Sequence, residues 1–323
     1  MAKRLLSGIR ASGKLHIGNY FGAMKQFVDF QDEYESFIFV ANYHSLTTLK
    51  DPKELRQNTI DVVKDYLAVG LDPEKVTLYT QTDVPEVTEL AWIFSTLTTM
   101  PYLMRAHAYK DAESKNKEIN VGVFNYPVLM AADILIVDTD VVPVGKDQQQ
   151  HVEMSKDIAQ KFNNTFGETF KLPKPLILNE VAVIPGIDGE KMSKSYNNTI
   201  PLFGTDDEIK TQVAKIITDS TPVGEIIDPE KDNVFALHKL FSKDQLAELE
   251  KKYREGGIGH KESKDILAEN IIKLISPMRE RREQISDEDV MEVLKKGAER
   301  VQKIAKVKLE EVRKKAGLLW TEF

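Results

Sequence analysis

Two lysines in a short polar segment are the first residues whose types and spacing could do chemistry. The stretch "GEKMSKSYNN" (189–198) holds Lys191 and Lys194 three residues apart, between a glycine and a pair of asparagines. The stretch is too polar to bury, and no side chain of "KMSKS" looks suited to a core, so we expect an exposed loop. Two flexible ammonium groups in such a loop suit a polyanion, above all a chain of phosphates.

A second phosphate candidate follows the first predicted strand. The stretch "GIRASGKLHIGNY" (8–20) opens a predicted helix, where free N–H groups and a partial positive charge favour an anion. One interpretation is a P-loop, because Gly8 to Lys14 fits the first seven places and "ILIVD", ending at Asp138, resembles the acidic partner strand. The eighth place must be Ser or Thr to hold Mg²⁺, and here it is Leu15, which argues against a P-loop NTPase.

The other interpretation takes "HIGN" as the working unit of this loop. His16 and Asn19 lie one helical turn apart and can face the same phosphate chain, while Gly18 lets a nucleotide approach the backbone. A surface histidine alone is usually inert. The prediction that "HIGN" binds phosphate therefore depends on its pairing with the lysine loop much later in the chain.

The segments before the lysine loop alternate between short apolar runs and helical patterns. The runs predict strands at 4–9, 36–42, 75–81 and 141–145, and the patterns predict helices at 18–34, 51–70, 85–99, 100–104, 121–133 and 146–163. Strands without polar alternation, separated by helices, predict an α/β fold with a Rossmann-like doubly wound parallel sheet. Such sheets bind ligands at the carboxyl ends of their strands.

The chain after the lysine loop loses its strand signals. From Asp206 onward the pattern is helical, and the last helix repeats its apolar residues with a 3.6-residue period from Val290 to Val312. We therefore expect a C-terminal all-helical domain and divide the chain into domains 1–197 and 198–323.

Composition narrows the class of protein. The 323 residues carry a net charge of −7 and no cysteine, so disulfides, thiolate zinc sites and cysteine-bound iron–sulfur clusters are excluded. The start "MAKRLLSGIR" has no long apolar region and no membrane span is expected, so we expect a cytoplasmic protein. Residues 293–315 carry nine basic and three acidic side chains, which suits either nucleic-acid phosphates or a solvated helix face.

The two phosphate candidates together resemble a known family. "KLHIGNY" (14–20) and "GEKMSKS" (189–195), in this order and on a parallel α/β sheet, are similar to the two signatures of class I aminoacyl-tRNA synthetases. "YPVLMAADIL" (126–135) and "VPVGKDQQQH" (142–151) resemble segments of tryptophanyl-tRNA synthetases, and the similarity extends from about Leu5 to Gly317. The sibling tyrosyl-tRNA synthetases would be expected to carry "GGxDQ"-like text in place of "VPVGKDQ".

The resemblance implies a tryptophan–tRNA ligase that works in two steps. The tryptophan carboxylate would attack the α-phosphorus of ATP, and tRNA(Trp) would then take the acyl group on its terminal adenosine. Mg²⁺ would arrive with ATP, the family works as a homodimer, and the iron–sulfur cluster of some relatives cannot form here. The alternatives are a tyrosyl-tRNA synthetase and a catalytically silent paralogue that binds tryptophan or tRNA.

The resemblance also implies a role for each matching residue. The catalytic residues would be His16, Asn19, Lys191 and Lys194. ATP would be bound by Arg10, Ala11, Ser12, Gly18, Asn19, Gly145, Lys146, Asp147, Val183, Lys191, Met192, Ser193, Lys194 and Ser195. Tryptophan would be bound by His44, Tyr126, Met130, Asp133, Val142, Val144 and Gln148, with Asp133 accepting the indole N–H. The plain alternatives are a helix-end carboxylate for Asp133 and core packing for the methionine and the valines.

The C-terminal helical domain would read the anticodon. The basic run 293–315 would be its phosphate-contacting face, and Tyr253, Arg279 or Arg281 could stack on an unpaired base. Three places depart from the family pattern. Ala11 stands where proline is usual, "ANYHSLT" (41–47) replaces the commoner acidic-Gln pair before its histidine, and Glu190 stands where relatives often carry a basic residue.

Overall fold

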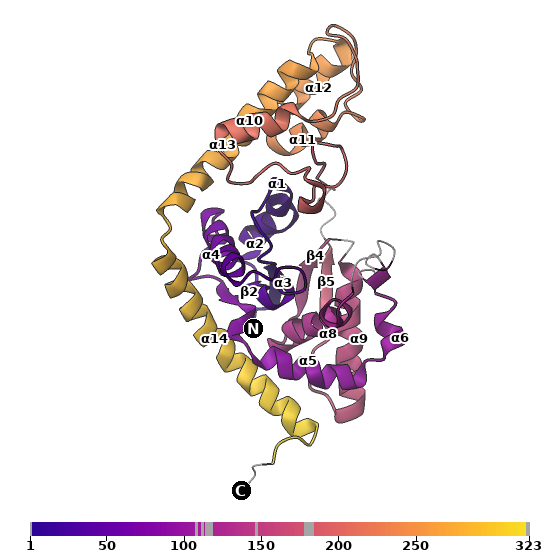
Figure 1. Ribbon diagram of the computed structural model, residues 1–323, viewed down its shortest axis with the longest axis vertical. Coiled ribbons are helices and arrows are strands. Elements are labelled where there is room, and N and C mark those ends of the chain that lie inside the picture. The colour runs from indigo at the N-terminus through magenta and orange to yellow at the C-terminus, as the bar shows by residue number, and fades with distance from the viewer. Residues whose placement is uncertain are drawn as a thin grey trace. The chain divides into compact units, whose positions relative to one another are not determined.

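The chain divides into two compact units. The computed structural model describes residues 2–106, 109–110, 113, 119–145, 148–177 and 184–320. The first unit, which we call the sheet unit, comprises Met1–Gly13, Gln26–Leu178 and Ser286–Phe323. The second, the helical unit, comprises Lys14–Lys25 and Asn179–Ile285 (Figure 1).

The sheet unit is built on five parallel strands. They are β1 (Arg4–Ile9), β2 (Glu35–Val40), β3 (Thr77–Thr80), β4 (Val141–Val144) and β5 (Lys174–Ile177), in the order β3-β2-β1-β4-β5. This order confirms the predicted Rossmann-like sheet. From β1 the chain adds β2 and β3 on one side of the sheet and then crosses to add β4 and β5 on the other side. The segments after β1 and β4 therefore lie at the switch point, where such folds bind ligands.

Strand β5 was not predicted from the sequence. Its four residues contain Pro175, which cannot donate a ladder hydrogen bond. The strand pairs only with β4 and forms an edge of the sheet, where a proline is tolerated. The apolar pattern of these four residues was too short to reveal the strand.

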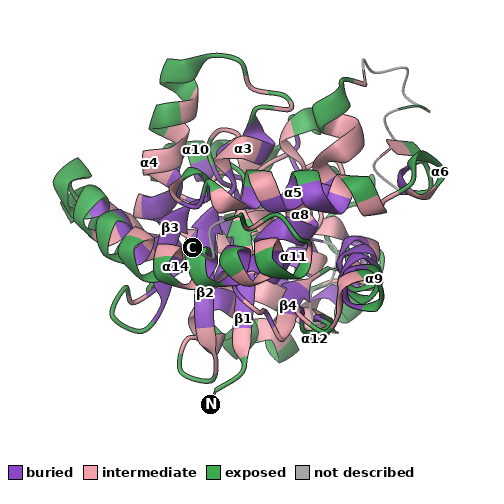
Figure 2. Ribbon diagram, turned by 90° about the horizontal axis from the view of Figure 1, so that it is seen from below, coloured by how far each residue is buried: buried purple, intermediate pink, exposed green. Residues whose placement is uncertain are grey.

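Helices cover the sheet, and most match their predicted positions. They are α2 (Lys25–Phe30), α3 (Asn42–Ser45), α4 (Pro52–Ala68), α5 (Glu86–Leu97), α6 (Met100–Leu103), α8 (Val121–Ile136), α9 (Gln149–Phe166) and α14 (Asp287–Lys315). Local sequence sets their starts: Asp51 accepts hydrogen bonds from the N–H groups of Lys53 and Glu54 at the start of α4, and Pro52 occupies its first turn. Figure 2 shows buried residues on the strands and on the helix sides that face them.

The helix predicted over 18–34 is less regular than expected. It consists of α1 (Ile17–Asn19), a π-helical turn η1 (Tyr20–Met24) and α2. A π-helical turn is rare and often accompanies a functional site. Here it follows directly on the "HIGN" residues.

Helix α14 packs along the edge strand β3. Gly297 makes this possible, because a Cβ at that position would lie 1.7 Å from the carbonyl oxygen of Leu78. The apolar residues Val301, Ala305, Leu309 and Val312 of α14 are buried in the core of the sheet unit. The helix therefore covers an edge that would otherwise expose unpaired backbone groups.

Several cations of the basic run 293–315 hold α14 in place. Lys308 is buried and its ammonium lies 2.9 Å from Asp138 Oδ1 and 2.8 Å from Glu311 Oε2. Arg300 pairs with Glu35 at 3.2 Å, and Arg313 pairs with Glu89. These three cations are engaged within the sheet unit, so the predicted phosphate-contacting face is reduced to the exposed lysines, among them Lys303 and Lys306.

The helical unit contains the helices predicted after residue 206. They are α10 (Asp206–Ala214), α11 (Asn233–Phe241), α12 (Leu246–Glu255) and α13 (His260–Gln284), around a small core of Ile227, Phe235, Leu249, Tyr253 and Ile258. Tyr253 is fully buried, and its hydroxyl group donates a hydrogen bond to Asp232 at 3.1 Å. The prediction that its ring could stack on an unpaired base was therefore wrong.

The compact units differ from the division at residue 197. Helix α14 buries its apolar stripe on the sheet rather than on the helices before it, so residues 286–320 belong to the sheet unit. The segment Lys14–Lys25 joins the helical unit because Ile17 donates a backbone hydrogen bond to Ile200 and Leu202 donates one to Leu15. Sequence periodicity contains no information about either long-range pairing.

Candidate active site

One face of α8 and one face of β4 carry the residues predicted to bind tryptophan. Tyr126, Met130 and Asp133 are spaced four and three residues apart, so they share one side of α8. Val142 and Val144 alternate along β4 and therefore share one side of the strand. Met130 and Val144 are only half-buried, whereas Val142 lies in the core. The set is thus partly core packing, as the plain alternative held.

Asp133 is the centre of a buried polar cluster in the sheet unit. The side-chain amide of Gln81 donates to both carboxylate oxygens, at 2.9 Å from Oδ1 and 2.8 Å from Oδ2. His44 Nε2 lies 3.0 Å from Oδ2, and because a carboxylate can only accept, this nitrogen donates. The backbone N–H of His44 in turn donates to Gln81 Oε1 at 3.3 Å. The cluster joins α3, α8 and the turn after β3.

The bonding of Asp133 leaves capacity for one more donor. A carboxylate has about four lone-pair positions; Oδ2 accepts two hydrogen bonds and Oδ1 accepts one from the residues described. Burial raises the pKa of Asp133, while the hydrogen bonds from His44 and Gln81 act against this rise. The two donors therefore favour the ionised form of Asp133 against the larger, opposing effect of burial.

Tyr126 connects this cluster to the switch point. Its hydroxyl group lies 2.9 Å from His151 Nε2, and its ring meets the ring of His44 edge-on with centroids 6.0 Å apart. Burial raises the pKa of Tyr126 to about 12, and the positive charge of Arg10 partly opposes this rise. Arg10 follows β1, so a residue predicted for ATP and residues predicted for tryptophan share one electrostatic environment.

Other residues predicted to bind ATP occupy the carboxyl ends of β1 and β4. Ser12 donates its backbone N–H to Arg10 in a tight turn after β1, and Ala11 is buried. Gly145 follows β4 and accepts a backbone hydrogen bond from Gln148, the residue that precedes α9. Lys146, Asp147 and Val183 lie outside the described residues.

In the helical unit, the segment that carries His16 lies beside the loop that carries Lys191 and Lys194. The pKa of His16 is lowered to about 4, first by burial and then by the positive charge of Lys194. A Cβ on Gly18 would lie 2.8 Å from His16 Nδ1 and 3.4 Å from Met192 Cβ, so only glycine leaves room between them. Asn19 Oδ1 accepts the backbone N–H of His16 at 3.1 Å. His16 is therefore neutral at pH 7 and lies within the field of a cation.

The lysine loop is more ordered than its composition suggests. Met192 donates a backbone hydrogen bond to Ile184 at 2.9 Å, and Lys191 pairs with Pro185 in an antiparallel bridge. The side chain of Met192 is buried, so the prediction that nothing in "KMSKS" suits a core was wrong for this residue. Lys191 and Ser195 are exposed, as predicted, and Ser193 and Lys194 are half-buried.

Two functional candidates were missed in the sequence. Gln81 is the last residue of the third predicted strand, 75–81, so its place at the carboxyl end of a parallel strand could have revealed it. Asn198 binds the lysine loop through its side chain, and a polar residue in a polar segment gave no signal.

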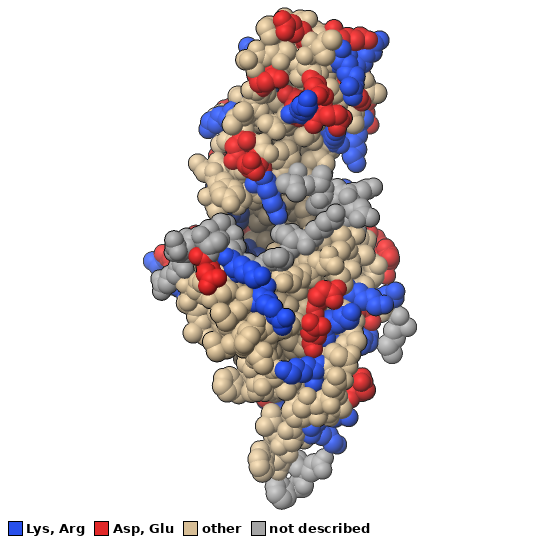
Figure 3. Space-filling view, turned by 90° about the vertical axis from the view of Figure 1, so that its right-hand side faces the viewer, with Lys and Arg blue, Asp and Glu red and all other residues tan. Residues whose placement is uncertain are grey.

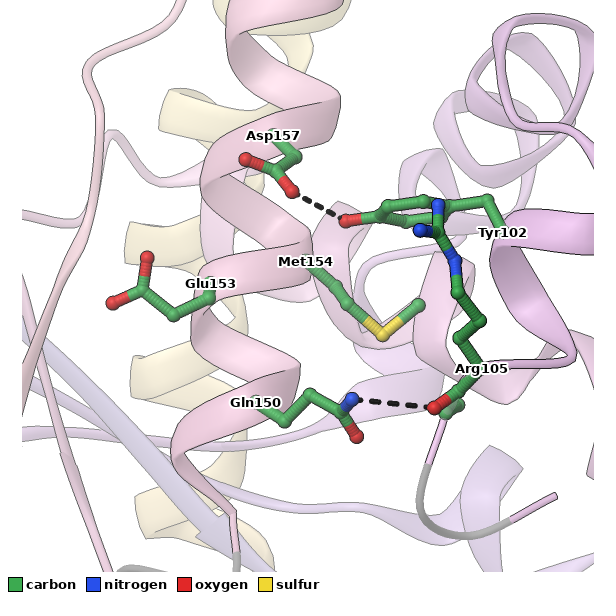
Figure 4. A pocket seen from close by; sticks show the side chains of 7 residues that line it. Tyr102, Arg105, Gln150, Glu153, Met154 and Asp157 are labelled. Carbon is green, nitrogen blue, oxygen red and sulfur yellow. Dashed lines mark hydrogen bonds between the residues drawn. The ribbon is translucent and has the colours of Figure 1, made fainter. Parts of the chain in front are cut away.

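Basic and acidic side chains are interspersed on the face drawn in Figure 3. A hollow of about 220 Å³ lies between α6 and α9, where Tyr102 donates to Asp157 at 2.6 Å and Gln150 donates to the Arg105 carbonyl (Figure 4). Among the described residues no cluster of His, Asp and Glu has the composition of a metal site, and no helix is long and apolar enough to span a membrane.

Comparison with known proteins agrees with this geometry. Residues 2–276 match the family model for "tRNA synthetases class I (W and Y)". The tryptophan–tRNA ligase of Fusobacterium nucleatum is 51% identical over 98% of both chains. The crystal structure of the tryptophanyl-tRNA synthetase of Campylobacter jejuni with ADP and tryptophan is 45% identical, covers 98% of this chain and 100% of that chain, and has a TM-score of 0.90. That of Mycoplasma pneumoniae is 31% identical over 99% of both chains, with a TM-score of 0.85. The chain belongs to the class I tRNA synthetases for tryptophan and tyrosine and, within them, to the tryptophanyl-tRNA synthetases.

Proposed function

We propose that this chain activates L-tryptophan with ATP and transfers it to the terminal adenosine of tRNA(Trp). The observation that carries the proposal is the pairing of "HIGN" with "KMSKS" in the helical unit, where His16 lies in the field of Lys194. The tryptophan–tRNA ligases to which the chain is 41–51% identical support the amino acid. A tyrosyl-tRNA synthetase, that of Archaeoglobus fulgidus, is 18% identical to this chain, a likeness that concerns the fold alone.

Adenylate formation needs position and charge rather than a protein nucleophile. Lys191 and Lys194 would neutralise the charge that develops on the leaving pyrophosphate. Neutral His16 and Asn19 would donate hydrogen bonds to the phosphate chain, and Gly18 would let it approach the backbone. Arg10 to Ser12 and Gly145 would bind the nucleotide at the switch point, where Rossmann-like folds hold such ligands. Fixing the two substrates in line would add to this electrostatic contribution by lowering the entropic cost of the reaction.

The amino acid would bind against α8 and β4. Asp133 Oδ1, with one lone-pair position left, would accept the indole N–H, the single polar atom of the side chain. Met130, Val142 and Val144 would line the ring, and Tyr126 and Gln148 would meet the ammonium group. His44 would act through Asp133, because its ring nitrogen donates to that carboxylate.

Mg²⁺ would arrive on ATP. The groups predicted to meet the phosphates are ammonium and imidazole rather than carboxylates, which suits an ion held chiefly by the substrate's own oxygens. Such an ion would supply charge neutralisation at the phosphates. Lys191 and Lys194 would provide the remaining positive charge from the protein.

We also propose a homodimer. Four apolar side chains on α5, α6 and the start of α8 are strongly exposed: Trp92, Met100, Met104 and Val121 at 72%, 66%, 44% and 80%. Exposed apolar residues gathered on neighbouring elements are typical of a protein interface. Light scattering after gel filtration should give twice the chain mass, and Trp92→Glu should shift it toward the monomer.

The tRNA would contact helices after residue 197, including exposed lysines of α14. A ligase that serves translation works where tRNA is found, so we place it in the cytoplasm. These two statements extend the family assignment, and the charge-reversal experiment described in the Discussion tests the first.

The decisive experiment is ATP–pyrophosphate exchange with tryptophan, tyrosine or phenylalanine. We expect exchange that depends on tryptophan and Mg²⁺, with tyrosine at least about a hundredfold worse in kcat/KM, because a shorter phenol does not bring its O–H to the acceptor that the indole N–H would meet and leaves that acceptor unpaired. Equal use of tyrosine would exclude the proposal. Binding of tryptophan without exchange would identify a silent paralogue instead.

A further inference from the structure

The side chain of Asn198 is buried beneath the lysine loop. Only 1% of the residue is exposed, although the residues before it, 195–197, are exposed. Its Oδ1 accepts the backbone N–H of Ser193 at 2.7 Å. Its Nδ2 donates to the backbone carbonyl of Lys191 at 3.1 Å and to Asp188 Oδ1 at 2.8 Å. One amide thus binds the loop backbone on both sides of Met192.

The surrounding backbone is shaped to admit this amide. A Cβ on Gly186 would lie 2.5 Å from the Asn198 side chain and 2.6 Å from its carbonyl oxygen, so only glycine fits there. The Asn198 carbonyl accepts the N–H of Ile187 at 3.0 Å, and Gly186 donates to the Glu190 carbonyl at 2.7 Å. Asp188 also accepts the N–H of Glu190 at 3.1 Å, which orients its carboxylate toward Asn198.

The bonds fix one half of the loop and leave the other half outside their reach. Lys191 to Ser193 are held by Asn198, by the bridge to Pro185 and by burial of Met192. Lys194–Tyr196 form a single 3₁₀ turn beyond these contacts, and Asn197 ends it in the left-handed conformation with φ of 52°. The direction in which Lys194 leaves the fixed half therefore depends on the backbone at Ser193.

We propose that Asn198 is a positioning residue for adenylate formation. This inference rests on the function proposed above. Asn198 holds the backbone from Lys191 to Ser193, so that the ammonium groups of Lys191 and Lys194 stay at the phosphates of ATP. Asn198 touches neither substrate and acts through the loop. A displacement of about 1 Å at such groups can cost about a hundredfold in rate, and the loss of three hydrogen bonds from a buried amide is enough to permit it.

A buried asparagine can also brace a loop outside the predicted site, and Asn163 is such a residue. Asn163 in α9 accepts the backbone N–H groups of Thr169 and Phe170 through Oδ1 and donates to the Phe170 carbonyl at 2.8 Å. It is buried to a similar degree, with 5% exposed, and lies in the sheet unit away from the lysine loop in sequence. Asn163→Ala is therefore a matched control for lost loop bracing.

The test compares Asn198→Ala with Asn163→Ala and with Asn197→Gly, which removes the exposed neighbouring amide while tolerating positive φ. The rate of tryptophanyl-adenylate formation is measured in a single turnover, transfer to tRNA is measured from preformed adenylate, and tryptophan binding is measured by calorimetry. For Asn198→Ala we expect adenylate formation to fall by about 10–10², with the transfer rate and tryptophan affinity within about twofold of wild type. Both controls should keep the wild-type rate of adenylate formation.

Three outcomes separate the ideas. Equal losses in both steps, or equal effects of Asn198→Ala and Asn163→Ala, would overturn the positioning role and leave a structural brace. Wild-type protein without tryptophan-dependent exchange would instead refute the proposed function itself. If Asn198→Ala does not fold, Asn198→Asp serves in its place, because it keeps an acceptor for Ser193 and loses both donated bonds. Adding Asp188→Asn to that variant removes the carboxylate repulsion and should restore part of the lost rate. A wild-type rate of adenylate formation in Asn198→Asp would refute the proposal.

Discussion

Replacing Asp133 by asparagine should separate its two tasks, holding the cluster and accepting the indole. The residue is 3% exposed and receives hydrogen bonds from two other buried side chains, Gln81 and His44. Asp133→Ala would leave both donors unsatisfied at about 1–3 kcal/mol each. The resulting 2–6 kcal/mol or so is a large share of a typical unfolding free energy of about 5–15 kcal/mol. We therefore expect the alanine variant to fold poorly, which makes it a weak probe of specificity.

Asp133→Asn keeps the shape and one acceptor oxygen. Gln81 can still donate to that oxygen, and His44 can accept one N–H of the new amide by changing tautomer, so both partners of Asp133 keep a hydrogen bond. What is lost is the charge: a hydrogen bond to a charged group is worth about 1.5–3 kcal/mol against about 0.5–1.5 for a neutral one. The difference of about 1–1.5 kcal/mol corresponds to about a tenfold fall in kcat/KM for tryptophan.

The assay is pyrophosphate exchange with tryptophan and phenylalanine on both proteins, with circular dichroism to confirm the fold. Phenylalanine has no N–H, so its kcat/KM should change little and the tryptophan-to-phenylalanine ratio should drop about tenfold. The KM for ATP should stay the same. A folded variant with an unchanged ratio would mean that Asp133 only joins the elements around it and that another group reads the indole.

Three further predictions concern charge. Lys194→Ala should lower the rate of activation by about 10²–10³, as expected for one preorganised charge contact, with tryptophan affinity unchanged by calorimetry; a loss of tryptophan binding alone would contradict this role. Lys303→Glu with Lys306→Glu should weaken tRNA binding and flatten its dependence on salt while exchange is spared, and an equal salt slope would mark a solvated face. The pKa of His16 is lowered to about 4 from 6.5 in the folded state. Between these two pH values the unfolded chain binds a proton that the folded state does not bind. Above pH 6.5 His16 is neutral in both states and does not change the unfolding free energy. As the pH falls from about 6.5 to about 4, the unfolding free energy should decline by up to about 1.4 kcal/mol per unit from this group, and urea titrations of His16→Gln should lack that share; equal slopes would show that His16 is not shielded.

The sequence predicts features that depend on local interactions and misses those that depend on contacts between residues far apart in the chain. Strands β1 to β4 and most helices were predicted because periodicity and caps such as Asp51 are local properties. The two signatures were also found locally, by residue type and spacing. Their meeting in one unit was expected only from the resemblance, because nothing local to His16 specifies the backbone bond between Ile17 and Ile200.

The docking of α14 illustrates the limit of charge counting. Nine basic residues in 293–315 are compatible with nucleic acid as long as their partners are unknown. Four of them find acidic partners that lie far away in the sequence: Glu35, Glu74, Glu89 and Asp138. A charge count treats these cations and the other exposed lysines of the run alike.

The same reasoning explains why Gln81, which binds Asp133, and Asn198, which binds the lysine loop, were not predicted from the sequence. Lys194 and Asp133 stand out because a cation in a polar loop and a carboxylate before an apolar run are unusual. Gln81 and Asn198 are uncharged, and their importance lies in holding a carboxylate at 2.8 Å and a loop carbonyl at 3.1 Å. Preorganisation of a site depends on such neutral amides, because they satisfy buried groups without adding a charge that must be compensated. Buried amides at the ends of strands and beneath loops are therefore the residues to examine next once a fold is known, as Gln81 and Asn198 illustrate.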